Sequence, residues 1–168
     1  PGKLFVGNVI RCSAAAALAA VVWLLALSFA DRANAEVVIV INKSTQRLHV
    51  LVDGAERYVW KTSTGTGGGP KNGAYRPERM ERSWYSRKYG MSPMPYSIFF
   101  HEGYAIHGTI YLSRLGSRAS HGCVRLHPDN AKILFDLVRE QGMGNTRIVV
   151  SNDDDVASKS AAPAAHLR

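Results

Sequence analysis

The sequence predicts a mainly β domain with one helix packed on it. β-Branched and alternating apolar runs dominate residues 37–61 and return at 146–150. A helical pattern with clear start and stop signals occurs at 128–141. The chain has 168 residues and shows no internal repeat, which suits one domain of ordinary size.

The first strands of this domain are joined by tight turns. The run VVIVIN at 37–42 leads into the turn sequence NKST, and the next strand places Leu48, Val50 and Val52 on one face. Asp53-Gly54 then marks a turn before a short strand at 57–61.

Residues 62–73, TSTGTGGGPKNG, predict a flexible glycine-rich loop. The loop fails both phosphate-binding templates, because Pro70 stands where GxGxxG has its last glycine and PKN replaces the Gly-Lys-Ser/Thr of a P-loop. Nucleotide binding is therefore rejected.

The segment 75–97 is aromatic, basic and punctuated by proline, and we expect a long excursion without regular elements. Beyond it, Glu102-Gly103 separates two apolar runs and predicts a hairpin that leads to His107.

The helix at 128–141 has Pro128 and Asp129 in its first turn, and Gly142 ends it. Its predicted core stripe consists of Ile133, Leu134, Leu137 and Val138. A strand at 146–150 follows. Residues 151–168 lack an apolar period and predict a disordered tail.

The first 35 residues are typical of a secretory signal peptide. Lys3 and Arg11 precede an apolar stretch at 14–30, and Ala-Asn-Ala at 33–35 forms a small-x-small cleavage site. An uncleaved anchor is the alternative, although the stretch falls short of the ~20 residues that span a bilayer. Either arrangement places the domain at 36–150 outside the cytoplasm, in the periplasm or cell envelope, with membrane contact only through an uncleaved signal.

Cleavage after Ala35 removes Lys3, Arg11, Arg32 and Asp31, so the formal net charge of +8 becomes +6. A basic exported domain is attracted to acidic polymers such as a cell wall, although a merely solvated surface explains the charge equally well. No nucleic-acid-binding motif is present, and no cofactor is expected.

Export makes the cysteine count informative. Cys12 lies in the signal, so the mature chain keeps Cys123 alone, within SRASHGCVRLHP. A lone thiol cannot form an intramolecular disulfide. It is therefore either a small buried hydrophobe or a reactive group.

The residues around Cys123 favour a nucleophile. A thiol with a pKa of about 8.5 needs a base or a positive charge to react at neutral pH, and His107 and His121 are the candidate bases. Gly122 permits a backbone conformation that aims its own N–H and that of Cys123 at a developing oxyanion.

Two further side chains near the cysteine are candidates for a supporting role. Arg125 offers a fork for a substrate carboxylate, and Ser120 offers a hydrogen bond to an imidazole. A zinc site made of His107, His121 and Cys123 is the alternative, but the paired close spacings typical of zinc ligands are missing. We therefore expect no metal.

Two motifs resemble a known family. HGT at 107–109 and SHGCVRL at 120–126, with twelve residues from 108 to 119, are similar to the signature of the L,D-transpeptidase catalytic domain, the YkuD family. The likeness extends from about residue 36 to 150 and includes STG at 63–65. One departure is GPKNG at 69–73, where the family commonly has Thr-Pro-x-Gly.

The resemblance implies a mixed β-sandwich with a helix alongside, and a role for each motif residue. Cys123 would attack the L-centre of diaminopimelate in a stem peptide and form a thioester, with His107 as base and the Gly108 carbonyl orienting the imidazole. His121, Gly122 and Cys123 would line the oxyanion side. Arg125 would bind a stem carboxylate, and carbapenems would acylate the cysteine.

The sequence alone leaves two questions open. The aromatic segment is expected either to cover the donor groove, with Trp84 and Tyr96 contacting substrate, or to pack on the sheet as a satellite cluster. An acceptor amine would give a 3→3 cross-link, water a carboxypeptidase or wall hydrolase, and a protein lysine an outer-membrane protein attached to the wall. A non-catalytic wall- or metal-binding module is the alternative from another class.

Overall fold

A computed structural model describes residues 34–153. The expected signal peptide at 1–35 and the expected disordered tail at 151–168 lie almost entirely outside these residues. The strands are β1 Val37–Asn42, β2 Arg47–Val52, β3 Ala55–Lys61, β4 Gly73–Tyr75, β5 Arg79–Glu81, β6 Tyr85–Ser86, β7 Ser92–Pro93, β8 Ser97–His101, β9 Tyr104–Gly108, β10 Val124–Leu126 and β11 Thr146–Ser151. The helices are α2 Pro128–Gln141 and the short 3-10 turns η1 Arg87–Tyr89, η2 Leu112–Arg114 and η3 Met143–Asn145.

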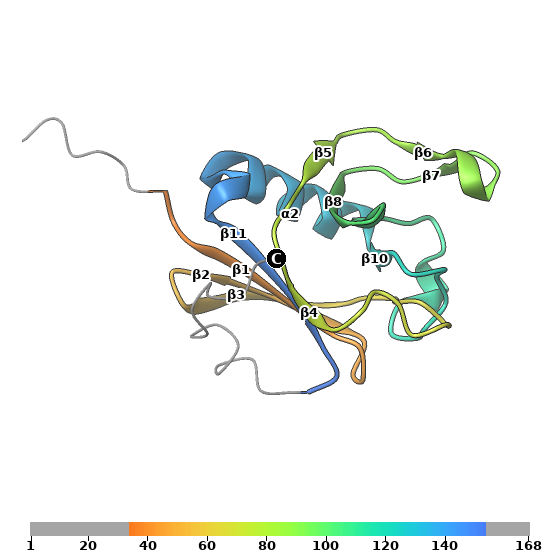
Figure 1. Cartoon of the computed structure of the whole chain (residues 1–168), viewed down its shortest axis with the longest axis horizontal. Coiled ribbons are helices and arrows are strands. Elements are labelled where there is room, and N and C mark those ends of the chain that lie inside the picture. Colours follow the sequence, from red (N-terminus) through yellow and green to blue (C-terminus); the bar gives the residue numbers. More distant parts are fainter. Residues whose placement is uncertain (1–33, 154–168) are drawn as a thin grey trace, which may run out of the picture. The chain divides into compact units, whose positions relative to one another are not determined.

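The strands form two mixed sheets and a separate two-stranded ribbon of β6 and β7 (Figure 1). The larger sheet has the order β3-β2-β1-β11-β4, with β1 and β11 parallel and the other neighbours antiparallel. The smaller sheet has the order β10-β9-β8-β5, and its parallel pair is β9 with β10. The prediction of a mainly β fold with mixed sheets and one packed helix is confirmed for the described residues.

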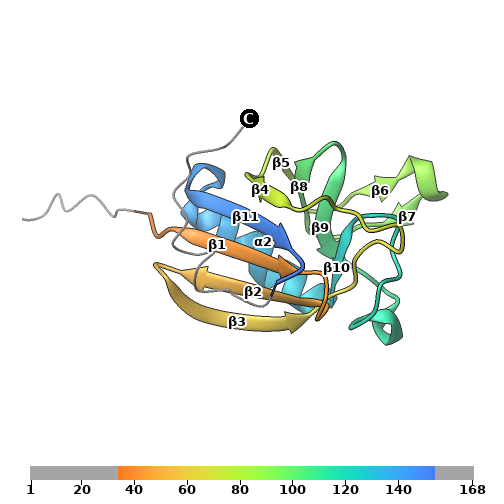
Figure 2. The ribbon, with the colours of Figure 1, turned by 60° about the horizontal axis from the view of Figure 1, so that its bottom comes forward.

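One core joins both sheets to α2. Inward side chains of β1 such as Ile39 share this core with Ile106 of β9 and Leu134 of α2, and none of the three is more than 1% exposed. Figure 2 shows α2 behind the five-stranded sheet. The smaller sheet is therefore held against the larger one through the helix and this shared apolar core.

The helix has the predicted bounds but a partly different buried face. Leu134 and Val138 are buried as expected, and they are joined by Ala131 and Phe135. Ile133, in contrast, is 42% exposed. The prediction for Ile133 was wrong because positions 131, 134, 135 and 138 follow the helical spacing more closely, which turns position 133 outward.

Three segments differ from the sequence-based expectations. β3 begins at Ala55, directly after the Asp53-Gly54 turn, and β11 ends at Ser151. The excursion at 75–97 is not irregular throughout, because it contains β5 and the β6–β7 ribbon around η1. The tail was expected to be disordered from residue 151, but its first residues make defined contacts. Ser151 belongs to β11, and the carbonyl oxygens of Asn152 and Asp153 accept hydrogen bonds from the side chains of Ser44 and Asn42.

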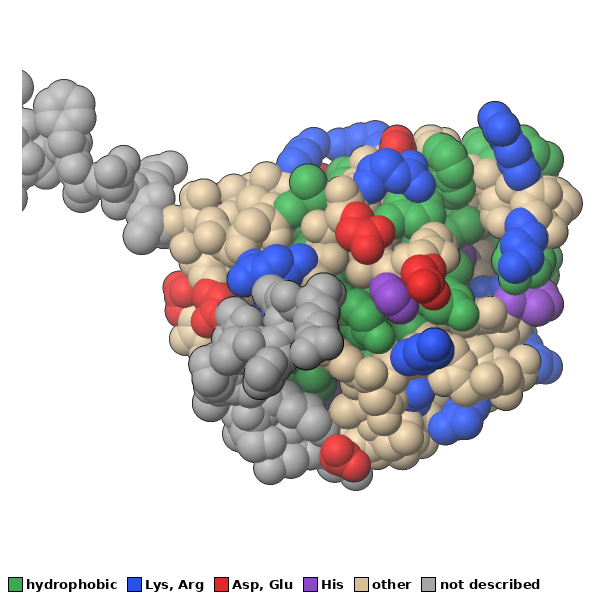
Figure 3. All heavy atoms as spheres, viewed as in Figure 1, with side chains coloured by type: hydrophobic (Ala, Val, Ile, Leu, Met, Phe, Trp, Pro, Cys, Tyr) green, Lys and Arg blue, Asp and Glu red, His purple; other side chains and the backbone are tan. Residues whose placement is uncertain are grey.

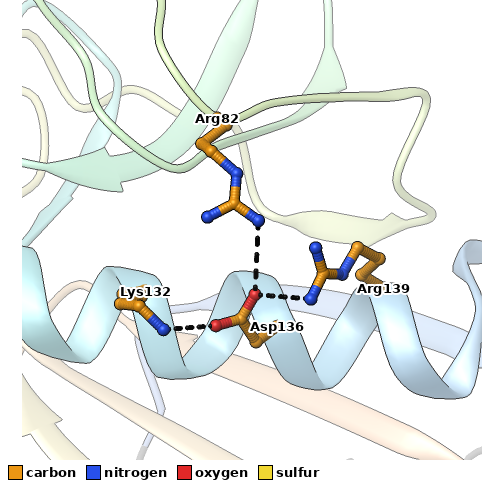
Figure 4. Close-up of polar contacts among 4 residues, drawn as sticks. All are labelled: Arg82, Lys132, Asp136 and Arg139. Atoms are coloured by element: carbon orange, nitrogen blue, oxygen red, sulfur yellow. Dashed lines mark hydrogen bonds and ion pairs between the residues drawn. The ribbon is translucent and has the colours of Figure 1, made fainter.

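A charge cluster joins the excursion to α2 (Figure 4). Asp136 lies 2.7 Å from Lys132 Nζ, 3.1 Å from Arg139 and 4.0 Å from Arg82, which follows β5. The hydrogen bond from Lys132, followed by the charges of the three cations, lowers the pKa of Asp136 below its ordinary value of 3.8. A lowered carboxyl pKa means that this cluster stabilises the fold above pH 3.8 and that the contribution is lost as the pH falls through the folded-state pKa.

The substitution Asp136→Asn tests this cluster. We expect the variant to melt a few degrees below the wild type at neutral pH and to match it in acid, where the wild-type carboxyl is protonated as well. The measurement is the melting temperature against pH. Glu140→Gln, an exposed position on the same helix, is the control and should show no such difference. A difference that persists in acid would assign the loss to packing instead of charge.

No helix within residues 34–153 is long and apolar enough to cross a membrane.

Candidate active site

A cavity of about 830 Å³ lies where four parts of the chain meet. Its walls come from residues 86–94, from the β8–β9 hairpin, from residues 109–114 and from residues 119–125. Cys123, His107 and Arg125 all line it. Arg87, Lys88 and Arg114 make the wall strongly basic. Figure 3 shows Lys and Arg side chains in blue around the end of the molecule where β6 and β7 lie in Figure 1.

Cys123 immediately precedes β10 and is half-buried. Its side chain packs against Met94, Phe99 and Ala105. Burial raises the pKa of the thiol, and a hydrogen bond with the Ala105 backbone and the charge of Arg125 act in the opposite direction. The resting cysteine is therefore a neutral thiol at neutral pH, in need of a base.

His107 lies on the strand beside the cysteine. In the parallel β9–β10 pair Ile106 is opposite Val124 and His107 is opposite Arg125. The Ala105 side chain belongs to the apolar cluster against which Cys123 packs, and Ala105 and His107 are two residues apart on β9, so their side chains project from the same face of the strand. The register thus turns the imidazole and the thiol toward one cavity.

The imidazole of His107 is only 5% exposed, and its orientation is fixed. Its Nδ1 lies 2.7 Å from the Gly108 carbonyl oxygen. A carbonyl can only accept, so Nδ1 carries the proton and Nε2 is left as an acceptor. Burial lowers the pKa of His107 to about 4, opposed by the Gly108 carbonyl and assisted by Arg125. The ring is therefore neutral at neutral pH and able to take a proton.

Ser120 supports the turn before the cysteine, not an imidazole. Its Oγ donates to the Cys123 carbonyl at 2.6 Å and accepts from the Gly122 N–H at 3.0 Å. The expected hydrogen bond from Ser120 to a histidine was wrong because the hydroxyl is used by its own turn. The Gly122 N–H was expected to point at a developing oxyanion. It donates to Ser120 Oγ instead, so that expectation was wrong.

Gly122 is required by both its conformation and its neighbour. Its φ is +136°, in a region that residues with a side chain rarely adopt. A Cβ at this position would lie 2.1 Å from Cε1 of Tyr104. The ring of Tyr104 therefore packs directly on the backbone that precedes the cysteine.

The substitution Gly122→Ala should displace the turn. Because the methyl group and the Tyr104 ring cannot occupy the same space, the thiol moves relative to His107, and a shift of about 1 Å costs on the order of 100-fold in rate. The measurement is the rate of Cys123 acylation by a β-lactam. In the background Tyr104→Ala, which removes the clash but not the φ requirement, the same substitution should cost less. Equal losses in both backgrounds would argue against the contact.

His121 and Arg125 lie on the cavity wall in different ways. The exposed ring of His121 stacks on Tyr89 with centroids 4.4 Å apart and an angle of 11° between the planes. Arg125 is half-buried, donates from Nη1 to the Ala119 carbonyl at 3.1 Å, and lies 5.8 Å from the centre of the Tyr111 ring.

Trp84 and Tyr96 do not line the cavity, which corrects the expectation that they contact substrate. Trp84 packs edge-on against Phe99 at 5.7 Å. Tyr96 packs against Phe135 of α2 at 5.9 Å. Both side chains cover apolar surface of the sheet and helix, as the satellite-cluster alternative predicted.

The tyrosines that line the cavity are instead Tyr89, Tyr104 and Tyr111. The sequence-based prediction missed them, although each lies close in sequence to a basic or motif residue. The signal that identifies Tyr104 is its position on the strand that carries His107, directly after the Glu102-Gly103 turn.

The zinc alternative finds no support in the described part of the chain. Residues 34–153 contain no group of three His, Cys, Asp or Glu side chains placed to hold a metal ion. His107, His121 and Cys123 therefore do not form the ligand set that this alternative requires.

Comparisons with known proteins show a family model that matches most of the described domain. A family model described as the L,D-transpeptidase catalytic domain (YkuD) matches residues 36–150. A search of the curated proteins finds no match.

Several solved structures share the fold. An L,D-transpeptidase from Mycobacterium smegmatis is 25% identical with a TM-score of 0.61, covering 70% of this chain and 59% of its own. One from Stackebrandtia nassauensis is also 25% identical with a TM-score of 0.61, covering 71% and 57%. L,D-transpeptidase 3 from Mycobacterium tuberculosis, in complex with a faropenem-derived adduct, is 22% identical with a TM-score of 0.59, covering 70% and 60%. The chain thus spans less than two thirds of the length of each.

Proposed function

The chain belongs to the L,D-transpeptidase catalytic domain (YkuD) family, and from this premise we propose that it is a cysteine-dependent L,D-transpeptidase acting on peptidoglycan stem peptides through a thioester. The observation that carries the proposal is the joint opening of Cys123 and His107 on one cavity, with the His107 Nδ1 held by the Gly108 carbonyl.

The acylation step transfers one proton twice. His107 Nε2 takes the proton of the thiol as the sulfur attacks the carbonyl carbon at the L-centre of diaminopimelate. The C–N bond to the terminal D-alanine then breaks, and the imidazolium gives its proton to the leaving amine. A thioester remains on Cys123, and free D-alanine departs.

The second step reverses these transfers with a new amine. The acceptor amine loses its proton to His107 and attacks the thioester carbon, and the sulfur leaves and recovers a proton from the imidazolium. An amide cross-link of the 3→3 type forms without ATP because one amide bond replaces another, and the thioester between them is reactive enough for an amine to attack.

The remaining roles follow from position. Of the two N–H groups expected to bind the oxyanion, only that of Cys123 is proposed here as the donor, because the Gly122 N–H donates to Ser120 Oγ. Arg125 faces the cavity and suits a stem carboxylate, and its charge also favours ionised Cys123. An acidic wall polymer as substrate requires an exported enzyme, which agrees with the signal peptide proposed for 1–35.

Two experiments test the proposal. Residues 36–168 are incubated with faropenem, and intact-protein mass with peptide mapping is expected to place one adduct on Cys123. Incubation with a disaccharide-tetrapeptide then distinguishes the acceptors: a 3→3 dimer indicates a transpeptidase, and a tripeptide without dimer indicates the carboxypeptidase alternative. Attachment to a protein lysine would appear as an adduct on an added acceptor protein. A folded, reduced sample without adduct or product would leave the non-catalytic binding module.

A further inference from the structure

The β1–β2 turn carries a lysine whose amine is buried beneath the glycine-rich loop. Lys43 is only 7% exposed, and its Nζ donates to the carbonyl oxygens of Gly68 and Pro70, both at 2.9 Å. Burial and the charge of Arg118 lower its pKa. A buried lysine is costly unless it makes such bonds, so the loop and the amine hold each other in place.

Gln46 holds the start of the same loop. Its Nε2 donates to Thr64 Oγ1 and to the Lys43 carbonyl, both at 2.7 Å, and its Oε1 accepts from the Thr64 N–H at 2.8 Å. Together Lys43 and Gln46 anchor residues 64–70 at both ends.

The anchored loop supports the turn that presents the cysteine. The Thr64 carbonyl accepts from the N–H groups of Ala119 and Ser120 at 2.9 and 3.0 Å, and the Thr66 N–H donates to the Ser120 carbonyl at 3.0 Å. A Cβ at Gly65 would lie 2.9 Å from the Gly122 Cα, so the two backbones touch. A shift of the loop therefore moves residues 119–122 with it.

We propose that Lys43, with Gln46, is a positioning residue for Cys123: it acts through residues 64–70 on the turn at 119–122 and so sets the place of the thiol relative to His107. The inference rests on the proposed function for its kinetic readout, but the accessibility of the thiol reports on it independently.

Loss of the anchor should affect two reactions of Cys123 in opposite directions. In Lys43→Met the carbonyls of Gly68 and Pro70 lose their donor and the turn loosens. Acylation by faropenem, which needs the thiol aligned with His107, is expected to slow about tenfold at saturation with a similar half-saturating concentration. Alkylation by iodoacetamide, which needs only an accessible thiolate, is expected to accelerate about threefold because a less buried thiol ionises more readily.

The matched control is Lys71→Met, an exposed lysine of the same loop, which should leave both rates unchanged. Gln46→Met removes the other anchor and should reproduce both changes if Lys43→Met does not fold. Folded variants with both rates within about twofold of wild type would overturn the proposal, as would parallel loss of both reactions. If wild type is alkylated but never acylated, the proposed function fails, and the alkylation rates alone decide the role of Lys43.

Discussion

Replacing Cys123 by alanine is expected to abolish adduct formation and turnover completely while the domain stays folded. The thiol is the free cysteine of the described residues, and every covalent step proposed above passes through its sulfur. Alanine lacks a nucleophilic atom, so no residual chemistry of the same kind remains. The side chain is small and packs in a minor apolar cluster with Met94 and Phe99, so the melting temperature should change by only a few degrees.

The matched variant is Cys123→Ser. A hydroxyl is far harder to ionise than a thiol, and a neutral imidazole with a pKa of about 4 is a weak base. We therefore expect serine to be as inactive as alanine, in an intact-mass assay with faropenem and in product analysis with a tetrapeptide. An adduct on the alanine variant would place the nucleophile elsewhere and reduce Cys123 to a packing residue.

The fold was largely predictable because local patterns agree with the tertiary structure. The turn at Asp53-Gly54, the hairpin at Glu102-Gly103 and the helix bounds at Pro128 and Gly142 follow from short-range chemistry. The pairing of β1 with β11 was not predictable, since the two strands are more than 100 residues apart and share only apolar character. The short strands β5 to β7 were not predictable either, because a strand of two or three residues is too short to show an alternating apolar pattern.

The candidate site was predictable where a residue is identified by its chemistry and not where it is identified by its contacts. Cys123 and His107 follow from the motif, and the structure places both on one cavity. The position of Ser120 near two histidines suggests a hydrogen bond to an imidazole, but its hydroxyl bonds the backbone of Gly122 and Cys123. The aromatic character of Trp84 and Tyr96 suggests substrate contact, yet the side on which each ring packs depends on the course of the whole excursion.

The role of Lys43 shows the same limit. A lysine in an Asn-Lys-Ser-Thr turn predicts a solvated side chain. Its burial depends on the glycine-rich loop, 25 and 27 residues further along the chain, which brings two carbonyl groups to its amine. The residues next to Lys43 carry no signal of this contact, so the local sequence alone does not predict that the amine is buried.

Replacing His107 by alanine is expected to slow acylation about 10³-fold at neutral pH and to change the pH profile. In the wild type the imidazole is neutral above a pKa of about 4 and the thiol stays protonated because burial raises its pKa. The resting pair is therefore neutral, and the proton moves during attack. The rate should stay level across the range between these two pKa values and fall in acid as protonation of His107 removes the base.

Without the imidazole only the rare thiolate reacts, so the rate of His107→Ala should rise about tenfold per pH unit up to the thiol pKa. The measurement is the acylation rate against pH for both proteins, with His49→Ala, a histidine paired with Glu56 on the β2–β3 hairpin, as the control that should match wild type. A level profile in His107→Ala would mean that another group takes the proton, and the exposed His121 would be the next residue to replace. A sloping wild-type profile would instead indicate that no base acts and that Arg125 alone promotes ionisation. The slope thus separates a proton that His107 takes during attack from a thiolate that a nearby charge stabilises beforehand.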